Sequence, residues 1–262
     1  MFEVITRLLL AGLAGALLAG CASLTSPPAR SLSSTMVAPG LGPIRSVVVD
    51  AGHGGRDPGT MHFGLREKDL ALDIARRLSA ELHARGLSVV MTRDRDEFLA
   101  LNRRPAVANR LPANLFISVH INANHSRRVS GAEVYYPRES VVGDSAAFPP
   151  RIEPQEVAWP TTTIRRILWD LVLSRSRRHS VHAASHICRA FRAQGVRCRG
   201  VKGARFVVLR EAQMPAVLVE VGYVSNRSEA KRLADPSYRQ RMAQAIAEGV
   251  AAYARELGLQ HI

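Results

Sequence analysis

The chain has 262 residues, 47% of them hydrophobic, and its formal net charge is +14 from 36 Lys and Arg against 22 Asp and Glu. This length and hydrophobic fraction allow one large domain with a substantial core, or two small ones. The charge suits an anionic partner, such as an envelope polymer or a membrane surface. Only 5% of residues are aromatic, and no recognition motif interleaves them with basic residues, so a nucleic-acid partner is not expected.

The first 21 residues predict an export signal that is not part of the fold. Arg7 precedes an apolar run over residues 8–20, which is too short to span a membrane comfortably. The run ends in Leu-Ala-Gly-Cys, and this ending resembles a bacterial lipoprotein signal in which Cys21 becomes the lipidated first residue. An ordinary secretory signal or a short anchor is the alternative.

The residue after Cys21 is alanine, not the aspartate that often retains lipoproteins at the inner membrane. The expected location is therefore the periplasm, with an anchor in the outer membrane. An acyl chain on a basic protein supplies the two signals that stable membrane attachment needs. Residues 22–44 are rich in Ser, Pro, Ala and Gly and predict a flexible tether, which leaves residues 45–262 for the folded domain.

A buried parallel strand is predicted at residues 46–49, where β-branched residues precede a glycine-rich turn. His53 lies in that turn, just past the carboxyl end of the strand, where open α/β sheets bind ligands. Apolar residues then recur at helical spacing within residues 64–86, and Glu67 lies at the start of this helix. Glu67 either complements the helix dipole or points back at His53.

A second strand at residues 87–92 completes a βαβ unit, which is expected to be right-handed. A helix is predicted near residues 101–109. A third strand over residues 115–124 contains His120, so a polar residue again falls towards a strand end. A fourth strand is predicted at residues 131–136.

Residues 138–162 are irregular and proline-rich, which predicts a long loop insertion of the kind that serves as a lid or regulatory segment. Helices are predicted at residues 163–175 and 179–192. His182 and His186 in the second helix have a spacing that can bind metal. No glutamate follows His182 as a metalloprotease motif requires, so a solvated or partly packed helix face is preferred.

The remaining elements are strands at residues 206–209 and 215–226 and a closing helix at residues 237–257, with a short helix capped by Ser225-Asn226 between them. Glu220 lies within the last strand among apolar residues, where a carboxylate is costly unless it is paired or lies next to a metal. Cys188 and Cys198 either form a disulfide in an oxidising compartment or remain unpaired thiols.

Two imidazoles and one carboxylate, from His53, Glu67 and His120, make the three-ligand pattern of a catalytic zinc site with one open position. Glu220 is then the candidate general base and proton shuttle. Ligand histidines usually need a partner on the second ring nitrogen. The candidates for such supporting roles are Asp50, Asn122 and His125.

Four blocks of the chain stand out: Asp50-Ala-Gly-His-Gly-Gly55, Gly64-Leu-Arg-Glu-Lys68, Ser118-Val-His-Ile-Asn-Ala123 and Val217-Leu-Val-Glu-Val-Gly-Tyr-Val-Ser-Asn226. Together they resemble the signature of the zinc-dependent N-acetylmuramoyl-L-alanine amidases of the AmiC type. The resemblance implies an α/β fold with a mixed, largely parallel six-stranded sheet and helices on both faces. It also implies zinc on His53, Glu67 and His120, with Glu220 as catalytic acid and base.

The implied reaction is hydrolysis of the peptidoglycan amide that joins the lactyl group of N-acetylmuramic acid to L-alanine of the stem peptide. Several relatives carry an inhibitory helix that a protein activator removes from the site. Here that place holds residues 138–162, in which Glu139, Glu153 or Glu156 could cap the zinc, although proline disfavours a long helix. The alternatives are a non-catalytic or activator-dependent cell-wall-binding lipoprotein on the same fold, and a different zinc peptidase or deacetylase.

Overall fold

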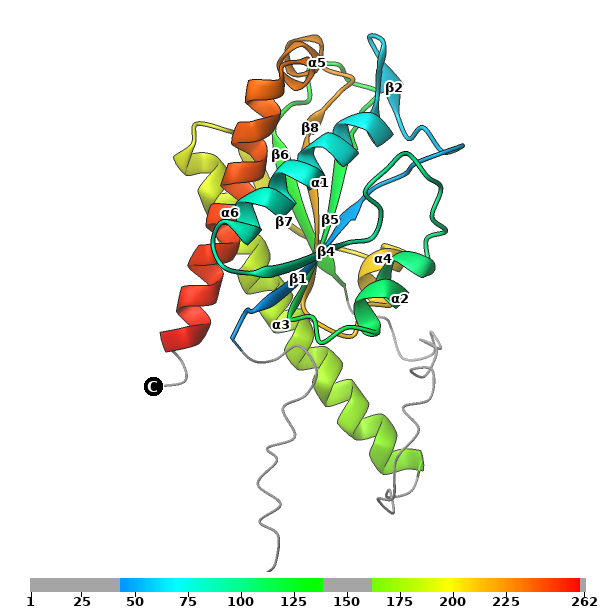
Figure 1. Cartoon of the computed structure of the whole chain (residues 1–262), viewed down its shortest axis with the longest axis vertical. Helices are drawn as coiled ribbons and strands as arrows, with labels where there is room; N and C mark the ends of the chain where they lie inside the picture. Colours follow the sequence, from blue (N-terminus) through cyan, green and yellow to red (C-terminus); the bar gives the residue numbers. More distant parts are fainter. Residues whose placement is uncertain (1–42, 139–161, 260–262) are drawn as a thin grey trace, which may run out of the picture. The chain divides into compact units, whose positions relative to one another are not determined.

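The computed structural model describes residues 43–138 and 162–259, and within them a six-stranded sheet has the strand order β4-β1-β5-β8-β6-β7 (Figure 1). The strands are β1 (Ser46–Ala51), β4 (Ser88–Met91), β5 (Leu115–Asn122), β6 (Ala132–Pro137), β7 (Cys198–Ala204) and β8 (Ala216–Tyr223). Strands β4, β1, β5 and β8 are parallel, and β6 runs antiparallel to β8 but parallel to β7. The expected mixed, largely parallel sheet is therefore confirmed.

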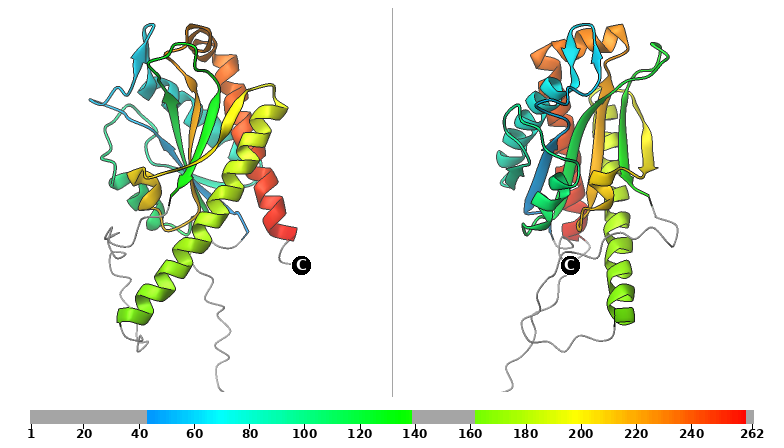
Figure 2. Two further views of the ribbon diagram at one scale, coloured as in Figure 1. Left: turned by 180° about the vertical axis from the view of Figure 1, so that it is seen from behind. Right: turned by 90° about the vertical axis from the view of Figure 1, so that its right-hand side faces the viewer.

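Helices cover both faces of the sheet, as expected (Figures 1 and 2). They are α1 (Glu67–His83), α2 (Arg103–Asn109), α3 (Thr162–Ala193), α4 (Val207–Arg210), α5 (Arg227–Ala234) and α6 (Pro236–Leu259). The larger core lies under α1, α3 and α6, and a smaller one lies under the short helices α2 and α4. Among the described residues, no helix is long and apolar enough to cross a membrane.

Alternation along the central strands decides which residues face the site. Val47, Val49, Ile117, Val119, Val217 and Val219 enter the larger core, whereas Val48, Phe116 and Leu218 enter the smaller one. Side chains two residues apart share a face. On the face of α2 and α4, the strands therefore continue from apolar residues to Asp50, to Ser118 and His120, and to Glu220. The polar side chains of this face therefore lie together at the carboxyl ends of β1, β5 and β8.

Besides the short strands β2 (Met61–His62) and β3 (Leu65–Arg66), which were not predicted, three elements differ from the sequence prediction. Helix α3 is continuous over 32 residues, because no glycine or proline interrupts residues 176–178, where the break was expected. The apolar run 206–209 is a short helix rather than a strand, which shows how ambiguous such short runs are. Strand β7 was not predicted, since its sequence Cys-Arg-Gly-Val-Lys-Gly-Ala lacks an alternating pattern.

Helices α2 and α6 agree with their predicted bounds to within two residues, whereas α1 occupies only Glu67–His83 of the predicted segment 64–86. Helix α5 begins after Asn226, whose side chain accepts a hydrogen bond from the backbone nitrogen of Glu229, so the predicted cap is confirmed. Ile44, assigned to the end of the tether, is buried in the larger core. The signal segment, residues 22–42 of the tether and residues 139–161 of the insertion lie outside the described residues.

Cys188 of α3 and Cys198 of β7 form a disulfide, with 5.5 Å between their Cα atoms. This resolves the two alternatives that the sequence left open. The bond ties the end of a long helix to an edge strand that has few apolar side chains of its own.

Replacing both cysteines with serine is expected to lower the free energy of unfolding by about 2–3 kcal/mol, because the unfolded chain regains the entropy of the closed loop. Denaturant unfolding of the oxidised protein and of the Cys188→Ser/Cys198→Ser variant measures the difference. A reducing agent should shift only the wild-type midpoint. Equal stability of the two proteins would show that the bond contributes nothing.

Candidate metal centre

His53, Glu67 and His120 come together at the carboxyl edge of the sheet. His53 follows β1, Glu67 opens α1, and His120 belongs to β5. Glu67 Oε2 lies 3.1 Å from His53 Nε2, and Glu67 Oε1 lies 2.9 Å from His120 Nδ1. One ligand atom from each residue lies within 4.8 Å of the others. Two imidazoles and one carboxylate in this arrangement could bind a divalent metal ion.

Neighbouring parallel strands bring the two histidines to the same edge, because β1 pairs with β5 in register. Two glycines allow the backbone to lie close against the side chains of His120 and Glu67. A Cβ atom on Gly52 would lie 2.4 Å from the His120 ring, and one on Gly59 would lie 2.5 Å from Glu67 Oε2. His53 itself has a positive φ of 57°. A strained backbone of this kind persists where the surrounding contacts hold it, as at functional sites.

The carboxylate of Glu67 is buried and held from four directions. Besides the two histidines, the backbone nitrogens of Thr60 and Ile121 donate to it, at 2.9 and 3.1 Å. Burial raises the pKa of Glu67, but the hydrogen bonds with His120 and His53 lower it by more than burial raises it. The net pKa therefore lies far below its usual range. Glu67 is therefore an ionised candidate ligand at neutral pH.

Asp57 is a site residue that the sequence analysis missed. Its Oδ2 lies 2.8 Å from His53 Nδ1, and its Oδ1 accepts a hydrogen bond from the backbone nitrogen of Gly59. This contact leaves His53 Nε2 directed at Glu67. Burial lowers the pKa of His53, while its hydrogen bonds with Glu67 and Asp57 raise it to above the usual value. An acid four residues after the histidine, in the same loop, was the available signal.

Glu220 lies directly beside His120, because the two residues are register partners on β8 and β5. Its Oε2 is buried and has no hydrogen-bond partner among the residues that the structure describes. Burial and the negative charges of Glu67 and Glu133 raise the pKa of Glu220 well above its usual value. A buried carboxylate without a partner is costly, so this atom points to a cation or substrate that completes its environment.

Asp50 acts on the His53 loop through another side chain. It is fully buried and accepts hydrogen bonds from Arg104 Nη1 at 2.9 Å, Thr92 Oγ1 at 2.5 Å and Ser118 Oγ at 2.6 Å. Arg104 in turn donates to the backbone oxygen of His53 at 2.7 Å. Asp50 therefore supports the position of the loop and does not orient a histidine ring.

The structure places the other two supporting candidates away from the ligand rings. Asn122 Oδ1 accepts a hydrogen bond from the backbone nitrogen of Ala123, and His125 is exposed in the following loop. Within residues 43–138 and 162–259, no hydrogen bond joins either side chain to His53 or His120. His182 and His186 both contact Glu256 of α6, at 2.7 and 2.5 Å. His182 is largely exposed and His186 largely buried, in agreement with the preferred solvated or partly packed helix face.

Two buried cations that the sequence analysis did not single out fix the glycine-rich loop. Arg93 donates to the backbone oxygens of Ala51, Gly52 and Lys68 at 2.7–3.0 Å. Lys68, next to the candidate ligand Glu67, donates to the backbone oxygen of Gly55 at 2.8 Å. The loop that carries His53 is thus held by side chains from distant parts of the chain.

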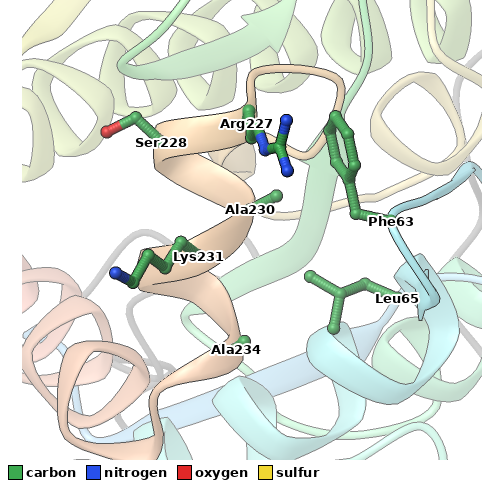
Figure 3. A pocket seen from close by; sticks show the side chains of 7 residues that line it. All are labelled: Phe63, Leu65, Arg227, Ser228, Ala230, Lys231 and Ala234. Carbon is green, nitrogen blue, oxygen red and sulfur yellow. The ribbon is translucent and has the colours of Figure 1, made fainter.

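A cavity of about 670 Å³ lies between α5 and the hairpin formed by β2 (Met61–His62) and β3 (Leu65–Arg66). Figure 3 shows Phe63 and Leu65 of the hairpin facing Ala230 and Ala234 of the helix. Arg227 and Lys231 add positive charge to the lining. Since β3 leads directly into Glu67, this apolar and basic surface adjoins the segment that supplies a candidate ligand.

The fold and the site together define a class: an α/β protein with a His-Glu-His group that could bind a metal at the carboxyl edge of its sheet. Residues 47–252 match the model of the Amidase_3 family, described as N-acetylmuramoyl-L-alanine amidase. The chain belongs to this N-acetylmuramoyl-L-alanine amidase family, whose members are generally metal-dependent. The expected family and enzyme class are confirmed.

Individual relatives agree with the family match. The chain is 33% identical over 221 residues to the N-acetylmuramoyl-L-alanine amidase AmiA of Escherichia coli, covering 80% of this chain and 76% of AmiA. It is also 33% identical over 210 residues to LytC of Bacillus subtilis, where the match covers 80% of this chain but only 36% of LytC. The catalytic domain of the amidase CwlV from Bacillus (Paenibacillus) polymyxa superimposes with a TM-score of 0.62 at 34% identity, covering 80% and 98% of the two chains.

Proposed function

We propose that this chain hydrolyses the peptidoglycan amide between the lactyl group of N-acetylmuramic acid and L-alanine of the stem peptide, with zinc as cofactor. The observation that carries the proposal is the placement of Glu220 beside His120, next to the convergent group His53, Glu67 and His120. Family membership supplies the reaction class. The site supplies a metal-binding group and a separate carboxylate for proton transfer.

The residues present fit a zinc ion. The donor set of two imidazole nitrogens and a carboxylate is the type found in catalytic zinc sites, and its members converge within 4.8 Å. The buried Oε2 of Glu220 lacks a partner among the described residues, as expected of a group whose partner is a substrate or solvent molecule at the centre. When bound, zinc would polarise the scissile carbonyl and lower the pKa of the attacking water.

The chain's own groups would move the proton. Glu220 accepts a proton from the water as that water adds to the lactyl carbonyl carbon. The carbon–nitrogen bond then breaks, and Glu220 delivers the proton to the leaving nitrogen of L-alanine. The products are a lactyl carboxylate on the glycan and a stem peptide with a free amino group. Asp57 holds the ring of His53 through Nδ1 during these steps, which leaves Nε2 for the metal.

The location is proposed from the sequence signals. Cleavage before Cys21 and its lipidation would place the domain in the periplasm, anchored to the outer membrane as a lipoprotein. The net charge of +14 would favour contact with anionic envelope polymers, and this attraction should weaken at high salt. Control by a protein activator through residues 138–162 is a further hypothesis, and most of that segment lies outside the described residues.

The test is a digest of purified sacculi by residues 22–262, followed by mass spectrometry of the soluble products. The zinc-loaded protein is expected to release stem peptides that begin with L-alanine and to leave peptide-free glycan, whereas chelated protein is expected to release neither. A chain lacking residues 138–162 runs beside both samples. Gain of activity in this deletion would support the inhibitory role of the segment.

Other products would change the conclusion. Peptides cut within the stem would indicate a peptidase, and loss of acetate from the glycan would indicate a deacetylase. Sacculi that bind the zinc-loaded protein but release nothing, even with residues 138–162 removed, would favour the non-catalytic cell-wall-binding alternative.

A further inference from the structure

A second charged cluster lies on the same sheet face as Glu220. Glu133 of β6 is buried, with only 1% of its surface exposed. Its Oε1 accepts hydrogen bonds from Arg199 Nε at 2.9 Å and Lys202 Nζ at 2.7 Å, and its Oε2 accepts one from Tyr135 Oη at 2.5 Å. We refer to Glu133, Arg199 and Lys202 as the β7 cation cluster, because both cations belong to that edge strand.

The strand register connects this cluster to the metal centre. Glu220 pairs with His120 on one side and with Glu133 on the other. Lys202 is the register partner of Tyr135, two residues after Glu133 on the same face of β6. The four neighbouring strands β5, β8, β6 and β7 therefore carry, in this order, the candidate ligand His120, the candidate acid and base Glu220, the carboxylate Glu133 and the two cations. At roughly 4.8 Å per strand spacing, β7 lies about 10 Å from β8.

The cluster retains binding capacity towards an outside anion. One carboxylate faces two cations, so the cluster carries a net positive charge. Lys202 has three N–H donors and Arg199 has five. One donor of each is directed at Glu133, and Arg199 Nη1 also donates to the backbone oxygen of Ser130 at 3.5 Å. The side chains of Arg199 and Lys202 are 30% and 44% exposed. Glu133 thus fixes the positions of two cations whose other donors can reach a ligand.

From this geometry we infer that Arg199 and Lys202 bind a carboxylate of the stem peptide, with Glu133 as the positioning residue. The inference rests on the proposed function. An extended peptide advances about 3.4 Å per residue, so the roughly 10 Å between β8 and β7 spans about three residues. Stem peptides carry free or amidated carboxyl groups within this distance. The ring of Phe206, 39% exposed and 5.3 Å from that of Tyr135, adds an apolar contact nearby.

The test compares two ligands that differ only in charge. One is N-acetylmuramoyl-L-alanyl-γ-D-glutamyl-diaminopimelate with free carboxylates, and the other is the same compound with those groups as carboxamides. Titration calorimetry with the zinc-loaded Glu220→Gln protein measures binding without requiring turnover. The carboxylate form is expected to bind about tenfold more tightly, since its charge-assisted hydrogen bonds replace neutral ones.

Lys202→Gln and Arg199→Gln, each made in the Glu220→Gln protein, are expected to reduce this preference by about three- to tenfold, while affinity for the carboxamide form stays the same. Partial exposure of both cations keeps the expected effect within this range. The matched control is Arg189→Gln, which removes an exposed cation from α3 and should leave the preference unchanged. Thermal melting of each variant confirms that the fold is retained.

A preference that survives both substitutions would overturn the inference, as would equal affinity for the two ligands or no measurable binding of the carboxylate form. The binding experiment and the test of the proposed function can fail independently. Failure of the wild-type protein to release L-alanine peptides would remove the amidase proposal, whereas the calorimetric preference is measured in a protein whose proton shuttle is already replaced.

Discussion

Glu220→Gln is expected to lower kcat for amide hydrolysis by about 10³-fold, within the range that general acid–base catalysis contributes. Glutamine has nearly the same shape but can neither take a proton from water nor return one to the leaving nitrogen. The affinity for zinc should change little, because the proposed ligands are His53, Glu67 and His120 and not Glu220. Activity and zinc binding should therefore separate in this variant.

Release of L-alanine-terminated peptides from sacculi measures the activity, and elemental analysis after dialysis measures the bound zinc. Glu211→Gln is the matched control, because Glu211 is an exposed glutamate at the end of α4 and its charge should not matter. A Glu220→Gln protein that keeps more than about a tenth of wild-type kcat, with zinc bound, would remove Glu220 from the proton-transfer role.

The fold was predictable wherever the local pattern and the tertiary context agree. The valine run of β1 and the apolar run of β8 are buried strands in both sequence and structure. The residues at 206–209 are a different case, because an apolar run of this length is compatible with either a strand or a helix, and its packing against α2 and β6 decides. Strand β7 depends on pairing with β6 and on the disulfide at Cys198, neither of which a local pattern reveals.

The site residues were predictable where a polar side chain lies at or just after the end of a predicted strand. His53, His120 and Glu220 were found because each stands out from an apolar or glycine-rich surrounding, and Glu67 was found at the start of a predicted helix. The structure brings the four residues together. Asp57 was missed because the only residues considered as partners of the histidine rings were Asp50, Asn122 and His125. The partners of Asp50 could not be found from sequence, since Arg104 lies 54 residues away and only the fold brings the two side chains into contact.

Asp50→Ala is expected to lower the free energy of unfolding by about 3–5 kcal/mol, the cost of leaving a buried charge without its partner. The side chains of Asp50 and Arg104 are 0% and 2% exposed and lie 2.9 Å apart. Arg93 is a second buried cation close to this pair. Burial lowers the pKa of Arg93 most, the charge of Arg104 lowers it as well, and the charge of Asp50 raises it. Removing Asp50 therefore leaves two buried positive charges facing each other.

Denaturant unfolding measures this loss, with Asp69→Ala as the control. Asp69 pairs with Arg66 on the surface, where both side chains are about half exposed, so its removal should change stability by less than about 1 kcal/mol. If the buried charge is the cause, Asp50→Ala/Arg104→Leu should recover part of the stability that Asp50→Ala loses. An Asp50→Ala protein as stable as the Asp69→Ala control would contradict this account.

The double variant also separates stability from the metal centre. Arg104 donates to the backbone oxygens of Ala51 and His53, and leucine cannot replace these bonds. Its affinity for zinc should therefore remain about 10- to 100-fold below wild type, the effect expected when a group supporting a metal ligand is lost. Recovery of the fold without recovery of zinc affinity would show that Arg104 keeps the His53 loop in position to bind, separately from the stability that the Asp50–Arg104 pair provides.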